Sequence, residues 1–235
     1  NLVTLSLYFA LSGVIFFMVL NLQQIQHYPP ILAGLGLLPT ILIITFLSGP
    51  AGSLADKIGP RIPMILGPAV VALGMGLLAI TGRNANYFTD YLPGLCLFGL
   101  GMAFVIAPLT KSALTVEPKY SGSASGVNNA VARVAGLLAV ALLGAIVVSI
   151  FSSNLTHKTY SSNLTNEQKS AILSQKNDLG DITYPLIFDQ KAKLDAQNIV
   201  EDSFILGFRW AMGICAFLAL ISAFISFATI RSPKK

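Results

Sequence analysis

Charged side chains are scarce in this chain. Asp, Glu, Lys and Arg together make up 11% of its 235 residues, whereas an average soluble domain carries roughly 25%. Hydrophobic residues make up 54% of the chain, and its mean hydropathy is +0.72. Such a composition leaves too few charges to cover a water-exposed surface, and it therefore indicates an integral membrane protein.

Cysteine and histidine are nearly absent, which argues against metal and redox chemistry. Cys96 and Cys215 both lie inside apolar runs, where a cysteine is a small core residue rather than half of a disulfide. His27 and His157 are far apart and lack metal-ligand spacing. The sequence also lacks the G-x-S-x-G, H-E-x-x-H and phosphate-loop motifs. We therefore predict no enzyme, no metal site and no cofactor.

The apolar residues gather into runs long enough to cross a bilayer as helices, for which ~17–25 residues suffice. Lys and Arg lie at the ends of these runs and form no basic stripe with interleaved aromatics, so membrane lipid is the predicted partner and nucleic acid is not. We predict an all-α polytopic membrane protein with six spans, at roughly 3–20, 32–48, 64–80, 92–109, 126–151 and 204–230.

Positive charges favour one side of the predicted membrane. The short connections on that side and the C-terminal tail carry these cations: Lys57, Arg61, Lys111, Lys119, Arg231, Lys234 and Lys235. Short connections on the other side hold only Arg83. Because cytoplasmic connections are enriched in Lys and Arg, we predict that both termini are cytoplasmic.

A polar segment divides the chain into three parts. Residues 1–151 hold five predicted spans, 152–203 form an extracytoplasmic segment with short helices, and 204–235 hold the sixth span and a basic tail. Thr165 and Gln168 have the spacing of a capping box that opens a short helix through Leu173. A turn-rich break at 178–185 follows, and a second helix is predicted from Asp189 into the last span.

The stretch 49–63, G-P-A-G-S-L-A-D-K-I-G-P-R-I-P, is the densest group of turn residues and charges in the first eighty positions. We predict a tight turn between the second and third spans. The stretch resembles the loop signature of the major facilitator superfamily, G-x-L-a-D-[RK]-x-G-x-[RK], although Ile58 and Pro60 depart from its usual pattern. The matching residues, which the resemblance implies are a conformational gate, are Gly52, Leu54, Asp56, Lys57, Gly59 and Arg61.

Four further segments resemble the last six helices of the fourteen-span drug:proton antiporter branch of that family. They are A-G-L-G-L-L-P at 33–39, D-Y-L-P-G-L at 90–95, A-P-L-T at 107–110 and S-G-V-N-N-A-V-A-R-V-A-G at 125–136. The resemblance implies the C-terminal half of a transporter in a bacterial cytoplasmic membrane. Such a transporter exports small amphipathic molecules by alternating access, driven by the proton gradient. The chain begins at Asn1 without Met, so we expect a fragment of a longer protein or a chain cut at a domain boundary, and the resemblance implies that the N-terminal half is missing.

Two polar faces could line a substrate cavity. Tyr8, Ser12 and Phe16 share a face of the first span, and in the resembled family that helix and the fifth help to line the cavity. On the fifth span, Ser125, Asn129 and Arg133 continue a four-residue spacing from Ser121. Ordinary helix packing is the alternative for the first face. For Arg133, the alternative is an anchor that binds a lipid phosphate or a neighbouring carbonyl.

Small residues recur every fourth position on two spans, where they predict close helix packing. They are Gly99, Ala103 and Ala107 on the fourth span, and Gly122, Gly126 and Ala130 on the fifth. No carboxylate lies deep in any predicted span, so a protonation site is expected in the missing half.

A non-transporting receptor or scaffold built on a transporter half is the alternative function. The long extracytoplasmic segment favours it, because transport alone does not require such a segment. An intramembrane enzyme ranks last, since the sequence has no nucleophile and base pair.

Overall fold

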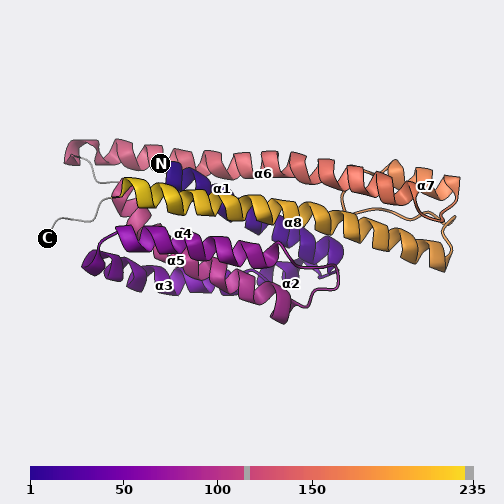
Figure 1. Ribbon diagram of the computed structural model, residues 1–235, viewed down its shortest axis with the longest axis horizontal. Helices are drawn as coiled ribbons and strands as arrows, with labels where there is room; N and C mark the ends of the chain where they lie inside the picture. The colour runs from indigo at the N-terminus through magenta and orange to yellow at the C-terminus, as the bar shows by residue number, and fades with distance from the viewer. Residues whose placement is uncertain (114–116, 231–235) are drawn as a thin grey trace.

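The computed structural model describes residues 1–113 and 117–230, and all of the regular secondary structure in them is helical (Figure 1). Six segments of this part are long and apolar enough to span a membrane, which confirms the predicted all-α polytopic fold. In chain order the spans are α1 (Leu2–Leu20) with η1 (Asn21–Ile25), α2 (Pro30–Leu35) with α3 (Leu38–Ile58), α4 (Arg61–Leu78), η2 (Tyr87–Tyr91) with α5 (Leu92–Ala113), α6 (Ser121–Tyr160) and α8 (Gln190–Thr229). The predicted basic tail at 231–235 lies outside the described residues.

The helices run side by side along the long axis of the molecule (Figure 1). Helix α4 packs against α5 and α8, α3 packs against α5, and α1 packs against both α6 and α8. The N-terminus and the end of α8 lie at the same end of the bundle, which we call the terminal end. This end also carries the turn between α3 and α4 and the short η3 (Pro118–Tyr120).

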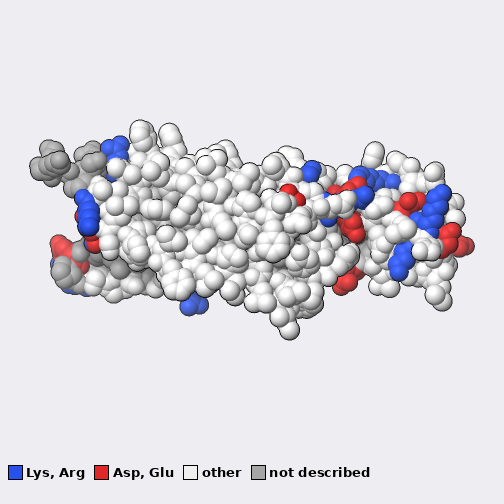
Figure 2. Space-filling model, turned by 90° about the horizontal axis from the view of Figure 1, so that it is seen from below, with Lys and Arg blue, Asp and Glu red and all other residues white. Residues whose placement is uncertain are grey.

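On the face shown in Figure 2, charged side chains gather toward the two ends, and the surface between them is mostly uncharged apart from an isolated cation at its edge. Large apolar side chains are exposed along the helices, Phe46, Leu66 and Phe224 among them. Phe17, Phe98 and Phe204 are fully buried between the helices. A surface this apolar is suited to lipid, since the helices satisfy their own backbone hydrogen bonds within the hydrocarbon.

Glycines bring α4 and α5 into backbone contact. A Cβ atom on Gly74 would lie 2.6 Å from the carbonyl oxygen of Gly94, and one on Gly101 would lie 2.6 Å from that of Gly67. These approaches leave no room for a side chain. Close contact between helix backbones is a main source of helix association in lipid.

Of the two predicted small-residue faces, the one on the fourth span packs against another helix and the one on the fifth span does not. Gly99 packs on α3, because a Cβ there would lie 3.0 Å from the carbonyl oxygen of Thr40. The prediction for the start of the fifth span is wrong in the described part of the chain. A Cβ on Gly122 or Gly126 would meet no atom within 4 Å, because this part of α6 is exposed.

Helices α6 and α8 are far longer than a membrane requires. Each has 40 residues, or about 60 Å at ~1.5 Å per residue, twice the ~30 Å of a hydrocarbon core. Both project beyond the other spans, and with α7 (Asn166–Leu173) they form a lobe at the end opposite the termini (Figure 1). The structure thus moves one predicted boundary, since α6 runs past 151 to Tyr160. It confirms the predicted helix from Asp189 into the last span, because Asp189 caps α8 and the helix begins at Gln190.

A buried stripe explains why α6 continues through its polar end. Every fourth residue is buried, and the stripe passes from the apolar span into the lobe: Ala135, Ala139, Leu143, Val147, Phe151, Leu155 and Thr159. The beginning of α8 supplies buried Ala196 and Val200 to the lobe. The two helices therefore share one continuous packing face, although the residues around it change from apolar to polar.

Hydrogen bonds order the rest of the lobe. The predicted capping box is confirmed, because the Thr165 hydroxyl accepts from the Gln168 N–H while the Gln168 side chain accepts from the Thr165 N–H. The Gln168 amide also donates to the carbonyl of Ile187 at 2.9 Å. Lys158 pairs with Asp202 at 2.8 Å and so links α6 to α8.

The glycine contact between α4 and α5 gives a direct test of the packing. Gly74→Ala should destabilise the full-length protein by about 1–3 kcal/mol, because the new Cβ would overlap the α5 backbone. The thermal midpoint of the purified protein in detergent measures this loss. Gly76→Ala is the matched control on the same helix, since its Cβ would meet nothing within 4 Å. Equal midpoints for the two variants would contradict the close packing.

Candidate functional site

The signature stretch lies at the terminal end, but most of it is helical. The predicted tight turn over 49–63 is therefore wrong in extent. Helix α3 continues through Pro50 to Ile58, and the chain reverses at Gly59, whose φ of 87° favours glycine. Membrane helices tolerate internal Pro and Gly because neighbouring helices support the freed backbone groups.

Asp56 joins α3 to α5 through a direct contact with Lys111, whose ammonium group donates to the carboxylate. Their side chains are 57% and 71% exposed, so the pair contributes only ~0–1 kcal/mol to stability. One turn earlier, a Cβ on Gly52 would lie 3.0 Å from the Cβ of Ala107. The ion pair therefore sits at the end of a close contact between α3 and α5.

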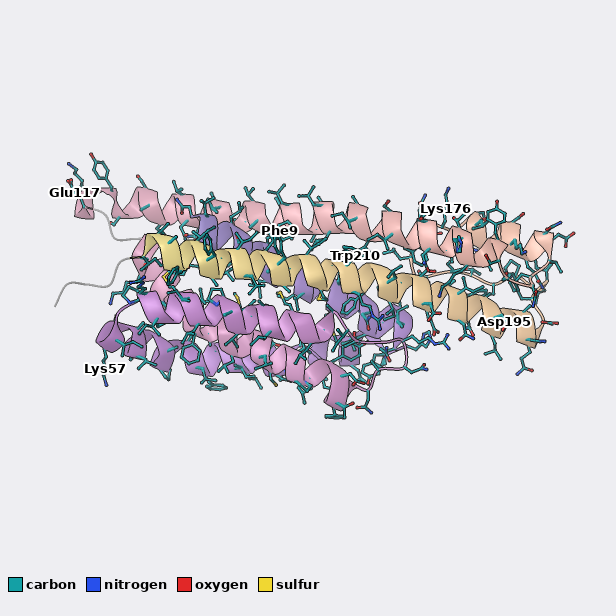
Figure 3. The ribbon with its side chains drawn as sticks, in the orientation of Figure 1. Phe9, Lys57, Glu117, Lys176, Asp195 and Trp210 are labelled. Atoms are coloured by element: carbon teal, nitrogen blue, oxygen red, sulfur yellow. The ribbon has the colours of Figure 1, made fainter. Side chains whose placement is uncertain are left out.

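The other signature residues separate into two groups. The Arg61 guanidinium lies 5.5 Å from the centre of the Phe227 ring and so connects the start of α4 to the end of α8. Leu54 and Lys57 are exposed, and Lys57 points away from the bundle at the end of α3 (Figure 3). Asp56 and Arg61 of the predicted gate thus make side-chain contacts that tie one helix to another.

The two predicted cavity faces lie on neighbouring helices, α1 and α6. Ser12 is used partly for packing, since its hydroxyl would lie 2.9 Å from a Cβ on Gly136 of α6. Tyr8 is half-buried, and Phe16 is 40% exposed. The α1 face is therefore divided between contact with α6 and open surface.

The polar stripe of α6 is mostly exposed. Ser125 is half-buried, and Asn129 and Arg133 are exposed. The buried amide is the neighbouring Asn128, whose Oδ1 accepts a hydrogen bond of 2.8 Å from the hydroxyl of Thr4 on α1. Sequence reasoning missed this pair, because the partners are 124 positions apart and neither carries a charge.

A buried polar network lies at the lobe end of the bundle. The Tyr91 hydroxyl donates to Asn21 Oδ1 at 2.8 Å, and both side chains are fully buried. Gln26 donates to the Tyr91 hydroxyl at 3.1 Å and to the carbonyl of Arg83 at 2.9 Å. Asn21 and Tyr91 belong to π-helical turns, which occur often at functional sites. The network fixes the first and fourth spans to each other.

A polar cavity of about 460 Å³ separates the lobe from the bundle. Its lining includes Gln24, His27, Tyr184, Lys193 and Glu201. Gln24 accepts from the Gly180 N–H at 3.2 Å, and His27 lies 3.5 Å from Glu201. Burial, followed by the Glu201 carboxylate, raises the pKa of the Tyr184 phenol above its usual value. Contacts from Gln24 and His27 to the lobe thus flank the cavity.

The described residues contain no group of three or more His, Cys, Asp or Glu side chains that could hold a metal ion. Six helices that are long and apolar enough to span a membrane define a polytopic helical membrane protein. The model of the Major Facilitator Superfamily matches residues 1–157, which include five spans and the signature stretch. The chain belongs to this superfamily.

Several curated relatives are named for resistance or export. The chain is 29% identical over 151 residues to "Multidrug resistance protein Stp" of Mycobacterium tuberculosis, covering 64% of the chain and 28% of that protein. It is 34% identical over 140 residues to "Puromycin resistance protein pur8" of Streptomyces alboniger, with coverages of 58% and 28%. It is 23% identical over 230 residues to "Tetracenomycin C resistance and export protein" of Streptomyces glaucescens, with coverages of 95% and 42%. The chain therefore spans less than half the length of these relatives.

Tyr91→Phe tests the buried network. Removing the hydroxyl leaves Asn21 Oδ1 buried without its donor, which should destabilise the full-length protein by about 1–3 kcal/mol. Thermal unfolding in detergent measures the effect. Tyr160→Phe is the control, since that side chain is exposed on the lobe. If the two variants unfold at the same temperature, the network does not hold the spans together.

Proposed function

We propose that this chain forms one six-helix half of a secondary active transporter that exports small amphipathic molecules from bacterial cells in exchange for protons. Family membership together with the names of the curated relatives carries the proposal. The second half would be another part of the same protein. The fourteen-span antiporter branch is the proposed subgroup.

In the proposed orientation, the terminal end faces the cytoplasm. Lys57, Arg61, Lys111 and Lys119 all belong to short connections or helix ends there, in line with the positive-inside rule. The lobe then lies outside the cell. Its polar surface suits water, and we assign it the role of a cap over the outer mouth of the bundle.

Alternating access requires contacts that exist in one state and break in another. The exposed pair of Asp56 and Lys111 is suited to this role, because it joins two spans at the proposed cytoplasmic surface and contributes little to stability. In the family the Asp56 position also meets the positive end of a helix from the opposite half, a term worth ~0.3–2 kcal/mol. We assign Asp56 the role of stabilising the state that is closed to the cytoplasm.

No deep carboxylate is available to carry the proton in the described spans. Asp56 lies near the end of α3, and Asp90 lies in η2 at the other end of the bundle. Proton coupling needs a titratable group that meets the two sides in turn. We therefore place that group in the other half of the protein.

A receptor or scaffold is the second candidate, and the lobe favours it. An ordered extension of two helices with its own buried core is more than a transport cycle requires. A receptor of this kind would bind its ligand without moving it.

Accumulation of a fluorescent amphipathic cation by intact cells separates these functions. Cells that express the full-length protein should retain less dye than cells with empty vector, and a protonophore should abolish the difference. Equal retention in both cell types, with the protein present in the membrane, would favour the receptor.

Asp56→Asn should slow this efflux without preventing membrane insertion. Loss of about 1 kcal/mol from one state changes the balance of states about 5-fold. Exchange of the charges, Asp56→Lys with Lys111→Asp, should restore part of the rate. Glu117→Gln is the matched control, because Glu117 is an exposed carboxylate at the same end whose partner, Lys119, is local. An efflux rate for Asp56→Asn equal to that of the parent would remove Asp56 from the gate.

A further inference from the structure

Arg209 lies at a defined depth in the membrane-spanning part of α8. Helix α8 ends at Thr229, and the 20 residue steps between Arg209 and Thr229 correspond to about 30 Å of helix, the thickness of a hydrocarbon core. Arg209 therefore lies at the lobe-side boundary of the hydrocarbon. Trp210 follows it on α8, near the level at which α4 ends (Figure 3), and tryptophan is enriched at this boundary.

A groove of about 490 Å³ runs along the surface of α8 from this point. Its lining residues all belong to that helix: Leu206, Arg209, Trp210, Gly213, Ile214 and Phe217. Trp210 and Phe217 are 57% and 63% exposed. A Cβ on Gly213 would meet nothing within 4 Å, so the glycine leaves an open notch between the two aromatic side chains.

The guanidinium of Arg209 is fixed in place by the end of α4. Its Nε donates to the carbonyl of Thr81 at 2.8 Å, and its Nη2 donates to the carbonyl of Ile80 at 3.3 Å. A guanidinium has five N–H donors, and these two acceptors are neutral. No carboxylate among the described residues forms a salt bridge with Arg209. Asp202, seven positions earlier on α8, pairs instead with Arg83 and Lys158. The guanidinium of Arg209 therefore places a fixed positive charge at the lobe-side end of the apolar groove.

We propose that this groove binds one anionic phospholipid of the lobe-side leaflet. The lipid phosphate accepts hydrogen bonds from Arg209 at the boundary. An acyl chain then lies in the notch at Gly213 and along Phe217, which are about 6 and 12 Å deeper in the hydrocarbon. The groove is polar at Arg209 and apolar from Gly213 to Phe217, just as a phospholipid is polar at its head group and apolar along its acyl chains. Arg209 supplies the counter-charge for the phosphate. This proposal rests on the membrane placement of α8 and not on efflux.

Native mass spectrometry of the full-length protein in detergent tests the proposal. Titration with phosphatidylglycerol and with phosphatidylcholine should show about 5- to 10-fold tighter first binding of the anionic lipid, the effect of one charge-assisted contact. Arg209→Gln should remove most of that preference, and Arg209→Lys should retain part of it. Glycerophosphoglycerol, which has the head group without acyl chains, should not displace the lipid.

A second variant tests the groove without disturbing the contacts of Arg209. Gly213→Leu should fill the notch and weaken binding of both lipids, and the protein should fold because a Cβ there has open space. Gly144→Leu is the matched control, since Gly144 of α6 has the same open surroundings and lies outside the groove. Equal binding of the two lipids by the parent, no effect of Arg209→Gln, displacement by glycerophosphoglycerol, or equal effects of the two leucine variants would each overturn the proposal.

Discussion

Hydrocarbon cannot hydrogen-bond to a peptide group, and this constraint governs the whole structure. Each span must satisfy its own backbone, so the described part of the chain crosses as helices even through Pro50 and the glycines around it. Association between the helices then depends on fit. Gly74 and Gly101 bring α4 and α5 into backbone contact, and the buried stripe of α6 continues from the bundle into the lobe.

Two kinds of polar interaction hold the helices together at the two ends of the bundle. At the terminal end, Asp56 and Lys111 form an exposed pair that contributes little to stability, and a weak contact is one that a transport cycle can make and break. At the lobe end, Asn21 and Tyr91 are fully buried and paired. A buried hydrogen bond is harder to break than an exposed ion pair, because its groups lose their partner without gaining water. The two ends are thus held by contacts of different kinds.

Local signals in the sequence predicted much of the fold. Apolar run length located the six spans, and the capping box at Thr165 located the short helix of the lobe. The end of α6 was missed because residues 152–160 are polar by composition, whereas the helix from Asp189 into the last span was predicted and is confirmed. The helical continuation of α6 depends on burying Leu155 and Thr159 on the same face as the span, which composition does not show. The density of Gly and Pro over 49–63 suggested a long turn, but only Gly59 and Pro60 lie outside the helices.

The candidate sites were harder to predict, because their partners are distant in sequence. The residue spacing in the sequence singled out the polar stripe of α6 and not the neighbouring Asn128, because only the fold brings Asn128 within hydrogen-bond distance of Thr4. Arg209 was overlooked because it lies within an apolar run, although its distance from the end of that run places it at a membrane boundary. Tyr91 lies in the D-Y-L-P-G-L segment, but that resemblance assigned it no role, and its role follows from the buried hydrogen bond to Asn21.

The orientation of the bundle is the central claim of this account. It can be measured in intact cells with a membrane-impermeant maleimide and the full-length protein in a cysteine-free background, with Lys57→Cys or Lys176→Cys added. Both side chains are exposed, and they lie at opposite ends of the molecule (Figure 3). Position 176 should label in intact cells, and position 57 only after the membrane is permeabilised. Labelling of position 57 but not of position 176 in intact cells would contradict the account.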